Sequence, residues 1–314
     1  RYAGGYVGRL DIGSAASVGD SLNVLGDLLD IDNIVKALNV VVSTIEHSDV
    51  YGDAAGYAVY ASDEGGTGSA GGYAGAVTGA HLQDANAHHF SHVIGRVAAG
   101  GYVGELEPGD AAHLLGDASI LNGLGVNANG LLSAVQTFIP TVRNSYTEAV
   151  PCGGIVRAQG KSDETTLRGM AGGYAGHNEG GSIWGDNTDS WKNKEYTGEK
   201  HTAEARRIRA VTGAEFAGGF DGLMEAADTA ETGGLSLLDG LVKTSNALGV
   251  LQAVYPTEET TQTTGPLRGL DPDTWNAWVK KVGQYGGYGE ELAVKGPVND
   301  QEALDELLDG YAYG

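Results

Sequence analysis

The hexapeptide AGGYVG occupies Ala3–Gly8 and returns unchanged at Ala99–Gly104. Four further segments keep the same pattern of small residues around one aromatic ring: AGGYAG at Ala70–Gly75 and Ala171–Gly176, AGGFDG at Ala217–Gly222, and the degraded GGYG at Gly286–Gly289. We call these six segments the glycine words. Self-similarity over long intervals is the sequence signature of repeat architecture, so the words predict a repeat protein.

The glycine words divide the chain into three repeat units, residues 1–98, 99–216 and 217–314, each with a first and a second word. Between its two words each unit has apolar residues three and four apart, at 21–45, 120–139 and 233–254. This spacing is typical of an apolar helix face, and the internal glycines favour short helical hairpins over one long helix. We expect the units to form one elongated solenoid domain, a fragment of a longer chain.

Short strand-like segments precede the words, at Ala58–Ala61, Val93–Ala98 and Gly154–Ala158. The words themselves alternate as strands do, and paired glycines are typical of tight bends where backbones approach closely. The sequence therefore predicts a mainly β fold, a parallel β-helix or solenoid with helical inserts, in which one aromatic ring per word stacks on the next. These rings are Tyr6, Tyr73, Tyr102, Tyr174, Phe220 and Tyr288.

One stretch, AGGYAGHNEGGSIWGDN at Ala171–Asn187, resembles the GLUG repeat of bacterial cell-surface proteins, whose pattern is GG-x-x-G-x-N-x-GG-x-I. The matching residues are Gly172, Gly173, Gly176, Asn178, Gly180, Gly181 and Ile183. The other words keep only the glycine pair and the aromatic residue, and the expected helical inserts are not part of the pattern. The resemblance implies β-helix-like coils in a large, secreted, often wall-attached protein, commonly an adhesin or a stalk.

Composition narrows the classes of function. The formal net charge is −22, which disfavours binding to nucleic acid and to anionic lipid. No apolar run approaches the roughly 18 residues of a membrane span, so we expect no membrane insertion. The single cysteine, Cys152, excludes an internal disulfide and fits both the cytosol and the disulfide-poor surface proteins of Gram-positive bacteria.

Catalytic and cofactor motifs are absent from the sequence: there is no P-loop, no G-x-S-x-G elbow and no HExxH. Acidic clusters allow Ca²⁺, but none has complete ligand spacing. His88 and His92, four residues apart, would share a helix face and offer two zinc ligands, while residues 79–93 also read as a polar loop. We therefore expect no enzyme activity and no cofactor.

A basic insert at 186–209 interrupts the acidic trend and lengthens the second unit. Charge contrast predicts that it docks on an acidic face of another copy. The residues of this interaction patch are Lys192, Lys194, Arg206, Arg207 and Arg209.

The repeated plan, without a concentrated set of catalytic residue types, favours a structural or adhesive module of an extracellular bacterial surface protein: a stalk, adhesin body or fibre segment. The partners expected are neighbouring repeats, copies of the same protein, or glycans and proteins of a cell surface. Two alternatives stay open. One is a glycan-binding or polysaccharide-degrading β-helix protein, which the many acidic residues allow. The other is a cytosolic scaffold.

Overall fold

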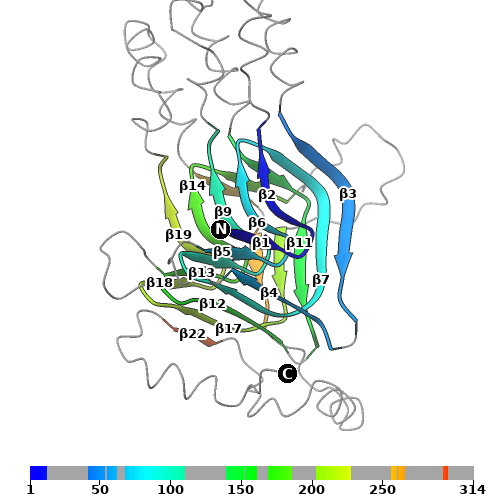
Figure 1. Ribbon diagram of the computed structural model, residues 1–314, viewed down its shortest axis with the longest axis vertical. Coiled ribbons are helices and arrows are strands. Elements are labelled where there is room, and N and C mark those ends of the chain that lie inside the picture. Colours follow the sequence, from blue (N-terminus) through cyan, green and yellow to red (C-terminus); the bar gives the residue numbers. More distant parts are fainter. Residues whose placement is uncertain are drawn as a thin grey trace, which may run out of the picture.

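The computed structural model describes residues 1–12, 42–53, 55–61, 68–109, 139–151, 153–160, 169–185, 203–227, 256–259, 261–265 and 293–295 (Figure 1). The described elements are β-strands, and they pair in parallel. Within this described part there is no helix, and none therefore that is long and apolar enough to cross a membrane. The mainly β prediction is confirmed for these residues.

Three parallel sheets build the fold. Sheet A contains β1 (Tyr2–Gly4), β5 (Ser69–Gly71), β8 (Ala98–Gly100), β13 (Met170–Gly172) and β18 (Phe216–Gly218). Sheet B contains β2 (Val7–Asp11), β6 (Ala74–Thr78), β9 (Val103–Glu107), β14 (Ala175–Glu179) and β19 (Asp221–Glu225). Sheet C contains β3 (Thr44–Tyr51), β4 (Tyr57–Ala61), β7 (His81–Gly95), β10 (Thr141–Arg143), β11 (Tyr146–Ala149), β12 (Gly154–Ala158), β15 (Ser182–Trp184), β16 (Ala203–Arg206), β17 (Ile208–Gly213), β20 (Thr257–Glu259), β21 (Thr261–Thr263) and β22 (Ala293–Lys295).

The chain visits the sheets in the order A, B, C and then returns to A one strand further along. Strands of sheets A and B pair in sequence order, so the path winds like a solenoid. We call one passage through A, B and C a coil and number the five coils from the N-terminus. The first predicted repeat unit, 1–98, covers the span of coils 1 and 2, and the second, 99–216, covers nearly all of coils 3 and 4.

Coil 2 runs from Ser69 to Val97 and is described without a gap. Its sheet C segment is the single strand β7, which bends at Asp84 (φ 48°) and His89 (φ 62°). His47 and Asn144 repeat the first bend in coils 1 and 3, with φ of 50° and 49°. These bends divide sheet C into three facets. The loop predicted for residues 79–93 is wrong, because His81–Gly95 is a strand that is buried throughout its last six residues.

The paired glycines stand at the corner between sheets A and B. A Cβ atom on Gly72 would overlap the carbonyl oxygen of Gly101, and one on Gly101 would overlap that of Gly173. Backbone hydrogen bonds continue through the corner, from Tyr73 N to Tyr102 O (2.8 Å) and from Tyr102 N to Tyr174 O (2.9 Å). Only glycine fits here, because successive coils lie at the strand spacing of about 4.8 Å.

The stretch with the GLUG-like pattern has a local structural explanation. Asn178 is buried, and its side-chain oxygen accepts a hydrogen bond from the Gly181 amide (2.9 Å). Gly180 has a φ of 69°, and Ile183 then points into the core. The Asn, the glycine pair and the Ile therefore make the corner between β14 and β15.

Coils 2 and 4 pass directly from sheet B to sheet C through Gly79 and Gly180, both with positive φ. In coils 1, 3 and 5 the described chain instead stops at Ile12, Gly109 and Ala227. Figure 1 shows the strands of sheet B pointing to one edge of the molecule, so Ile12, Gly109 and Ala227 lie at the same corner. Most of the predicted helices lie in these stretches, outside the described residues.

Four residues of the first predicted helix, 42–45, are described, and Thr44 and Ile45 among them begin strand β3 instead. Ile45 pairs with Leu82 of β7. The apolar spacing of the predicted helix extends into this strand, because inward-facing strand residues are also apolar. Periodicity alone could not distinguish the end of the helix from the start of the strand.

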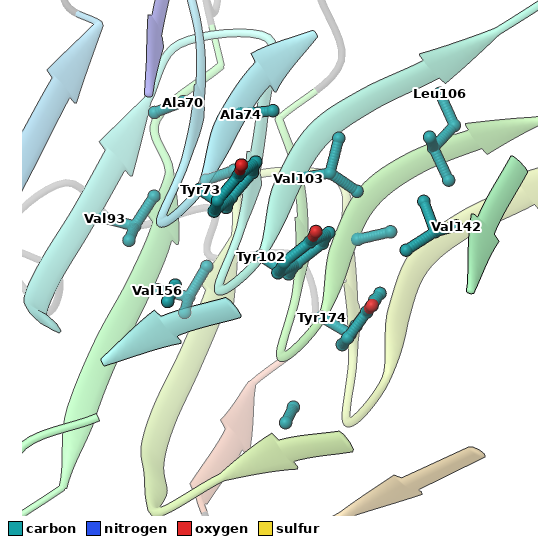
Figure 2. Close-up of a cluster of buried hydrophobic side chains, with 14 of the residues drawn as sticks. Ala70, Tyr73, Ala74, Val93, Tyr102, Val103, Leu106, Val142, Val156 and Tyr174 are labelled. Atoms are coloured by element: carbon teal, nitrogen blue, oxygen red, sulfur yellow. The ribbon is translucent and has the colours of Figure 1, made fainter. Parts of the chain in front are cut away.

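The core fills the space inside the coils, where inward-facing residues of equivalent register meet. Figure 2 shows Tyr73, Tyr102 and Tyr174 side by side, between valines of sheet C and the apolar residues of sheet B. The three tyrosines are among the largest fully buried side chains. The core is therefore a set of columns that run along the winding axis.

Candidate functional site

The rings of the glycine words form one continuous stack. Ring centroids are 5.0 Å apart between Tyr6 and Tyr73, 5.2 Å between Tyr73 and Tyr102, 4.8 Å between Tyr102 and Tyr174, and 4.7 Å between Tyr174 and Phe220. Each pair is nearly coplanar, with interplanar angles of 6–19°. The sixth ring, that of Tyr288, lies outside the described residues, in the sequence between β21 and β22.

Each buried tyrosine hydroxyl reaches across the core to sheet C of the preceding coil. The Tyr73 hydroxyl bonds the Ser48 side chain (2.6 Å), and that of Tyr102 donates to Ala85 O (2.7 Å). The Tyr174 hydroxyl donates to Ser145 O (3.0 Å). Phe220 has no hydroxyl, and the coil that it would reach back to carries the inserted stretch between Gly185 and Ala203.

Burial keeps these phenols neutral. It raises the pKa of Tyr73 to about 12, and it raises those of Tyr102 and Tyr174 well above the ordinary value. A neutral phenol with its hydrogen bond made inside the core neither attacks a substrate nor exchanges protons near neutral pH. The stack is therefore a structural element that links adjacent coils.

A second stack lies on the outer face of sheet C. The ring of His88 lies 4.2 Å from that of Tyr51 and 5.1 Å from that of Tyr146, and the guanidinium of Arg206 lies 4.1 Å above Tyr146. His88 Nε2 is 3.6 Å from the Asp49 carboxylate. Burial lowers the pKa of His88, and Asp49 partly opposes this. The stack thus links four coils from outside with aromatic and charged side chains.

The two histidines predicted as metal ligands do not share a helix face, because both lie on β7 with the His89 bend between them. His92 is buried, and burial together with nearby Arg209 lowers its pKa to about 4. In the described ranges no group of three His, Cys, Asp or Glu side chains is arranged to hold a metal ion. Cys152 lies outside those ranges.

The described arginines of the predicted basic patch make contacts within the chain. Arg206 forms an ion pair with Glu204, and Arg207 lies 3.1 Å from Glu148. Arg209 sits on β17 in the same region. Lys192 and Lys194 lie outside the described residues. Arg207 and Arg206 therefore contact Glu148 and Tyr146 of the preceding coil, and the docking of a second copy on this patch stays a prediction.

Ionisable side chains gather on the face of sheet B that lies toward sheet A, and sequence reasoning missed them. We call this group the sheet B cluster. Its residues are Arg9, Asp11, Glu105, Glu107, His177, Glu179 and Glu225. Parallel pairing aligns Arg9, Glu105 and His177 in one column and the remaining carboxylates in the next. Glu105 and His177 therefore lie at the strand spacing, while strand β6 of coil 2 separates Glu105 from Arg9.

Glu105 is the most perturbed member of the sheet B cluster. Its carboxylate accepts a hydrogen bond from the Ser69 hydroxyl (2.5 Å), and the side chain is buried. Burial, followed by the charge of Glu107, raises the pKa of Glu105 to about 7. Burial and Glu179 also raise the pKa of Glu107. His177 Nε2 lies 3.0 Å from Glu225. The cluster therefore holds a proton near neutral pH.

A second buried acid stands inside coil 5. Asp221 occupies the inward column that coils 2 and 3 fill with Ala74 and Val103. Burial, and then the neighbouring Glu258, raises the pKa of Asp221 well above the ordinary value. The apolar core thus becomes polar at its C-terminal end.

The sheet B cluster can be found in the sequence by aligning the words. The residue after the third glycine is Arg9, Ala76, Glu105, His177 and Leu223 in successive coils. Such an alignment shows that these side chains share a column, but not that the column is buried against sheet A.

Comparison with known proteins adds no relative. No family model matches the chain, and neither the curated proteins nor the solved structures contain a match.

Proposed function

We propose that this chain is a non-enzymatic structural module of an extracellular bacterial surface protein, of the stalk or adhesin type. The single observation that carries the proposal is the interior stack of Tyr6, Tyr73, Tyr102, Tyr174 and Phe220, which links all five coils. A load along the axis would have to separate the stacked rings together with the backbone ladder at the glycine corners. The GLUG-like stretch and the net charge of −22 support a location outside the cell.

Mechanical pulling tests the scaffold. The chain is held by its two ends in optical tweezers and extended. We expect the coils to unfold at a clear force peak that falls in Tyr102→Ala, because that ring stacks on two neighbours and bonds Ala85. Extension without a force peak in the wild-type chain would contradict the proposal. Tyr60→Ala, an exposed ring of the first coil, is the control.

The second candidate is a glycan-degrading protein, and the carboxyl group of Glu105 on the same strand as Glu107 favours it. A carboxyl group with a pKa of about 7 next to a second carboxylate resembles the acid and base pair of glycoside hydrolysis. A reducing-end assay on a panel of polysaccharides decides between the candidates. Cleavage by the wild-type chain that Glu105→Gln abolishes would favour the enzyme, and no cleavage is expected if the chain is a scaffold.

A further inference from the structure

Three inward-facing columns of the core become polar at one place, in coils 4 and 5. The polar residues are Asp221 and Asn178 on sheet B and Glu258 on sheet C. The residues that precede them in the same three columns are apolar: Val7, Ala74, Val103 and Ala175; Leu10, Val77 and Leu106; and Ile45, Leu82, Val142 and Ile183. Because three separate columns change together, the change indicates a site with its own purpose inside the solenoid core.

The polar atoms at this place are buried and unsatisfied. They are both carboxylate oxygens of Asp221, Oε1 of Glu258 and Nδ2 of Asn178, and in the described part of the chain none of them has a hydrogen bond of acceptable geometry. The Asn178 side chain is completely buried. Buried polar atoms without partners cost free energy, and buried charges cost more. The arrangement therefore calls for a group that the protein itself does not supply.

The electrostatics of Asp221 show what kind of group is needed. Burial, and then the nearby Glu258, raises the pKa of Asp221 well above its ordinary value. Asn178 and the backbone amide of Ala175 oppose this rise, because an N–H group directed at a carboxylate favours its charged form. None of these neighbours carries a positive charge. Donors for an ionised Asp221 are thus in place, and a positive charge between the two acids would complete the arrangement.

We propose that Asp221 and Glu258 bind a divalent cation of the Ca²⁺ type in the interior of coil 5, between sheets B and C. Asp221 would supply both of its carboxylate oxygens and Glu258 its Oε1, which are the buried oxygens without partners. Asn178 would donate from Nδ2 to Asp221 and hold that carboxylate in place. Water would complete the shell of about six to eight oxygens that Ca²⁺ takes. This site goes beyond the proposed structural function and does not depend on it.

The chemistry of the two ligands selects the metal. Carboxylate oxygens suit Ca²⁺ and Mg²⁺, whereas zinc in structural sites takes mainly cysteine and histidine. Mg²⁺ requires nearly ideal octahedral geometry, while Ca²⁺ accepts the irregular geometry that two carboxylates from different sheets would offer. The two carboxylates also balance the charge of one divalent cation, so the filled site would leave the core without net charge.

The cation would connect one sheet to another within a single coil. Asp221 lies on β19 and Glu258 on β20, so coordination by both would join sheet B to sheet C. In coil 3 the equivalent residues are Val103 and Val142, which belong to one apolar cluster. Coil 5 would therefore be closed by coordination where coil 3 is closed by apolar packing, and its stability would depend on the concentration of the cation.

Thermal unfolding of the full chain in Ca²⁺ and in EDTA, with calorimetric titration of Ca²⁺, tests the site. Asp221→Asn and Glu258→Gln each remove one charge with little change of shape. Glu259→Gln is the matched control, because it removes one charge from the next residue of β20, which is exposed. Circular dichroism checks that each variant is folded. Asp221→Val, which copies Val103 of coil 3, replaces Asp221→Asn if that variant does not fold.

We expect Ca²⁺ to bind the wild-type chain and Glu259→Gln and to raise the unfolding temperature of both. In Asp221→Asn and Glu258→Gln the Kd for Ca²⁺ should rise at least about tenfold, because one charged ligand is lost. The order of stability should also reverse. In Ca²⁺ the two variants should unfold at a lower temperature than the wild type, and in EDTA at a higher one, since the repulsion between two buried acids is gone.

Two results would overturn the site. One is an equal response to Ca²⁺ in the wild type, Asp221→Asn and Glu258→Gln, which would show that the acidic surface binds the ion adventitiously. The other is a wild-type chain with the same unfolding temperature in Ca²⁺ and in EDTA. In that case, a stability that falls with rising pH in the wild type but not in Asp221→Asn would identify a shared proton as the group that neutralises the pair.

Discussion

The same hexapeptide, AGGYVG, stands in coil 1 and in coil 3 with the same local backbone but in two different environments. Tyr6 is half exposed and stacks on one ring, whereas Tyr102 is fully buried between two rings and donates a hydrogen bond to Ala85. The glycine word determines the local bend of the backbone, and the neighbouring coils determine how deeply its ring is buried. A comparison of equivalent residues in the two copies therefore separates the effect of local sequence from the effect of packing.

The largest difference is expected for the ring. Tyr102→Ala should lower the free energy of unfolding by about 4 kcal/mol, since it removes a buried ring and leaves a cavity. Tyr6→Ala should cost about 1 kcal/mol, because that ring has water on one side. Chemical denaturation measures both. Equal losses would show that the environments do not differ as the structure describes.

The third glycine of the word gives the next difference. A Cβ on Gly104 would lie 2.8 Å from Ala70 O and 2.9 Å from Ala70 N, whereas one on Gly8 meets Tyr2 O at 3.1 Å and little else. We expect Gly104→Ala to cost about 3 kcal/mol and Gly8→Ala less than about 1 kcal/mol. Thermal unfolding of the two variants measures this, and a milder effect at Gly104 would contradict the close packing of coils 2 and 3.

The residue that follows the word is Arg9 in one copy and Glu105 in the other. Because the folded-state pKa of Glu105 is raised to about 7, its protonated form stabilises the fold fully below pH about 4.5. That contribution, roughly 2–3 kcal/mol, is lost as pH rises through 7. Glu105→Gln should therefore flatten the fall in stability between pH 5 and 8 by about this amount. An unchanged pH profile in Glu105→Gln would refute the raised pKa.

The smallest difference is expected for a single hydroxyl. Tyr102→Phe keeps the ring and removes its hydrogen bond to Ala85 O, so it should cost about 1 kcal/mol. Tyr6→Phe should change stability by less than about 0.5 kcal/mol, since an exposed hydroxyl loses only water. Urea denaturation resolves the two. A larger loss at Tyr6 would place that hydroxyl in a contact with another copy.

Much of the scaffold could be predicted from the sequence. The words predicted the solenoid-like winding and the ring stack, because glycine and one aromatic residue recur wherever backbones approach and rings must fill the corner. The strand of Gly154–Ala158 was predicted with its correct bounds. These features depend on residues close in sequence, where pattern and structure are directly linked.

The sheet B cluster could not be predicted in the same way. Glu105 and His177 are ordinary polar residues in the sequence, and they become neighbours only through pairing between β9 and β14. The spacing of four residues between His88 and His92 was misread as one turn of a helix, because a bent strand can have the same residues at the same spacing. Whether Glu105 and His177 are buried against sheet A depends on the register between strands, and a single sequence does not show that register.

The uneven length of the coils has a consequence for how the molecule comes together from an extended chain. Ser69 pairs with Ala98 across a coil that has no insert, while Tyr2 with Ser69 and Ala98 with Met170 pair across stretches more than twice as long. Bringing the ends of a longer loop together costs more entropy, and distant parallel pairing is slow. Coils 2 and 3 should therefore form first, as a nucleus that offers a finished strand edge on each side. Folding would then spread outward in both directions. Coil 1 is synthesised before coil 2, but it would fold only after the strands of coil 2 are available for pairing.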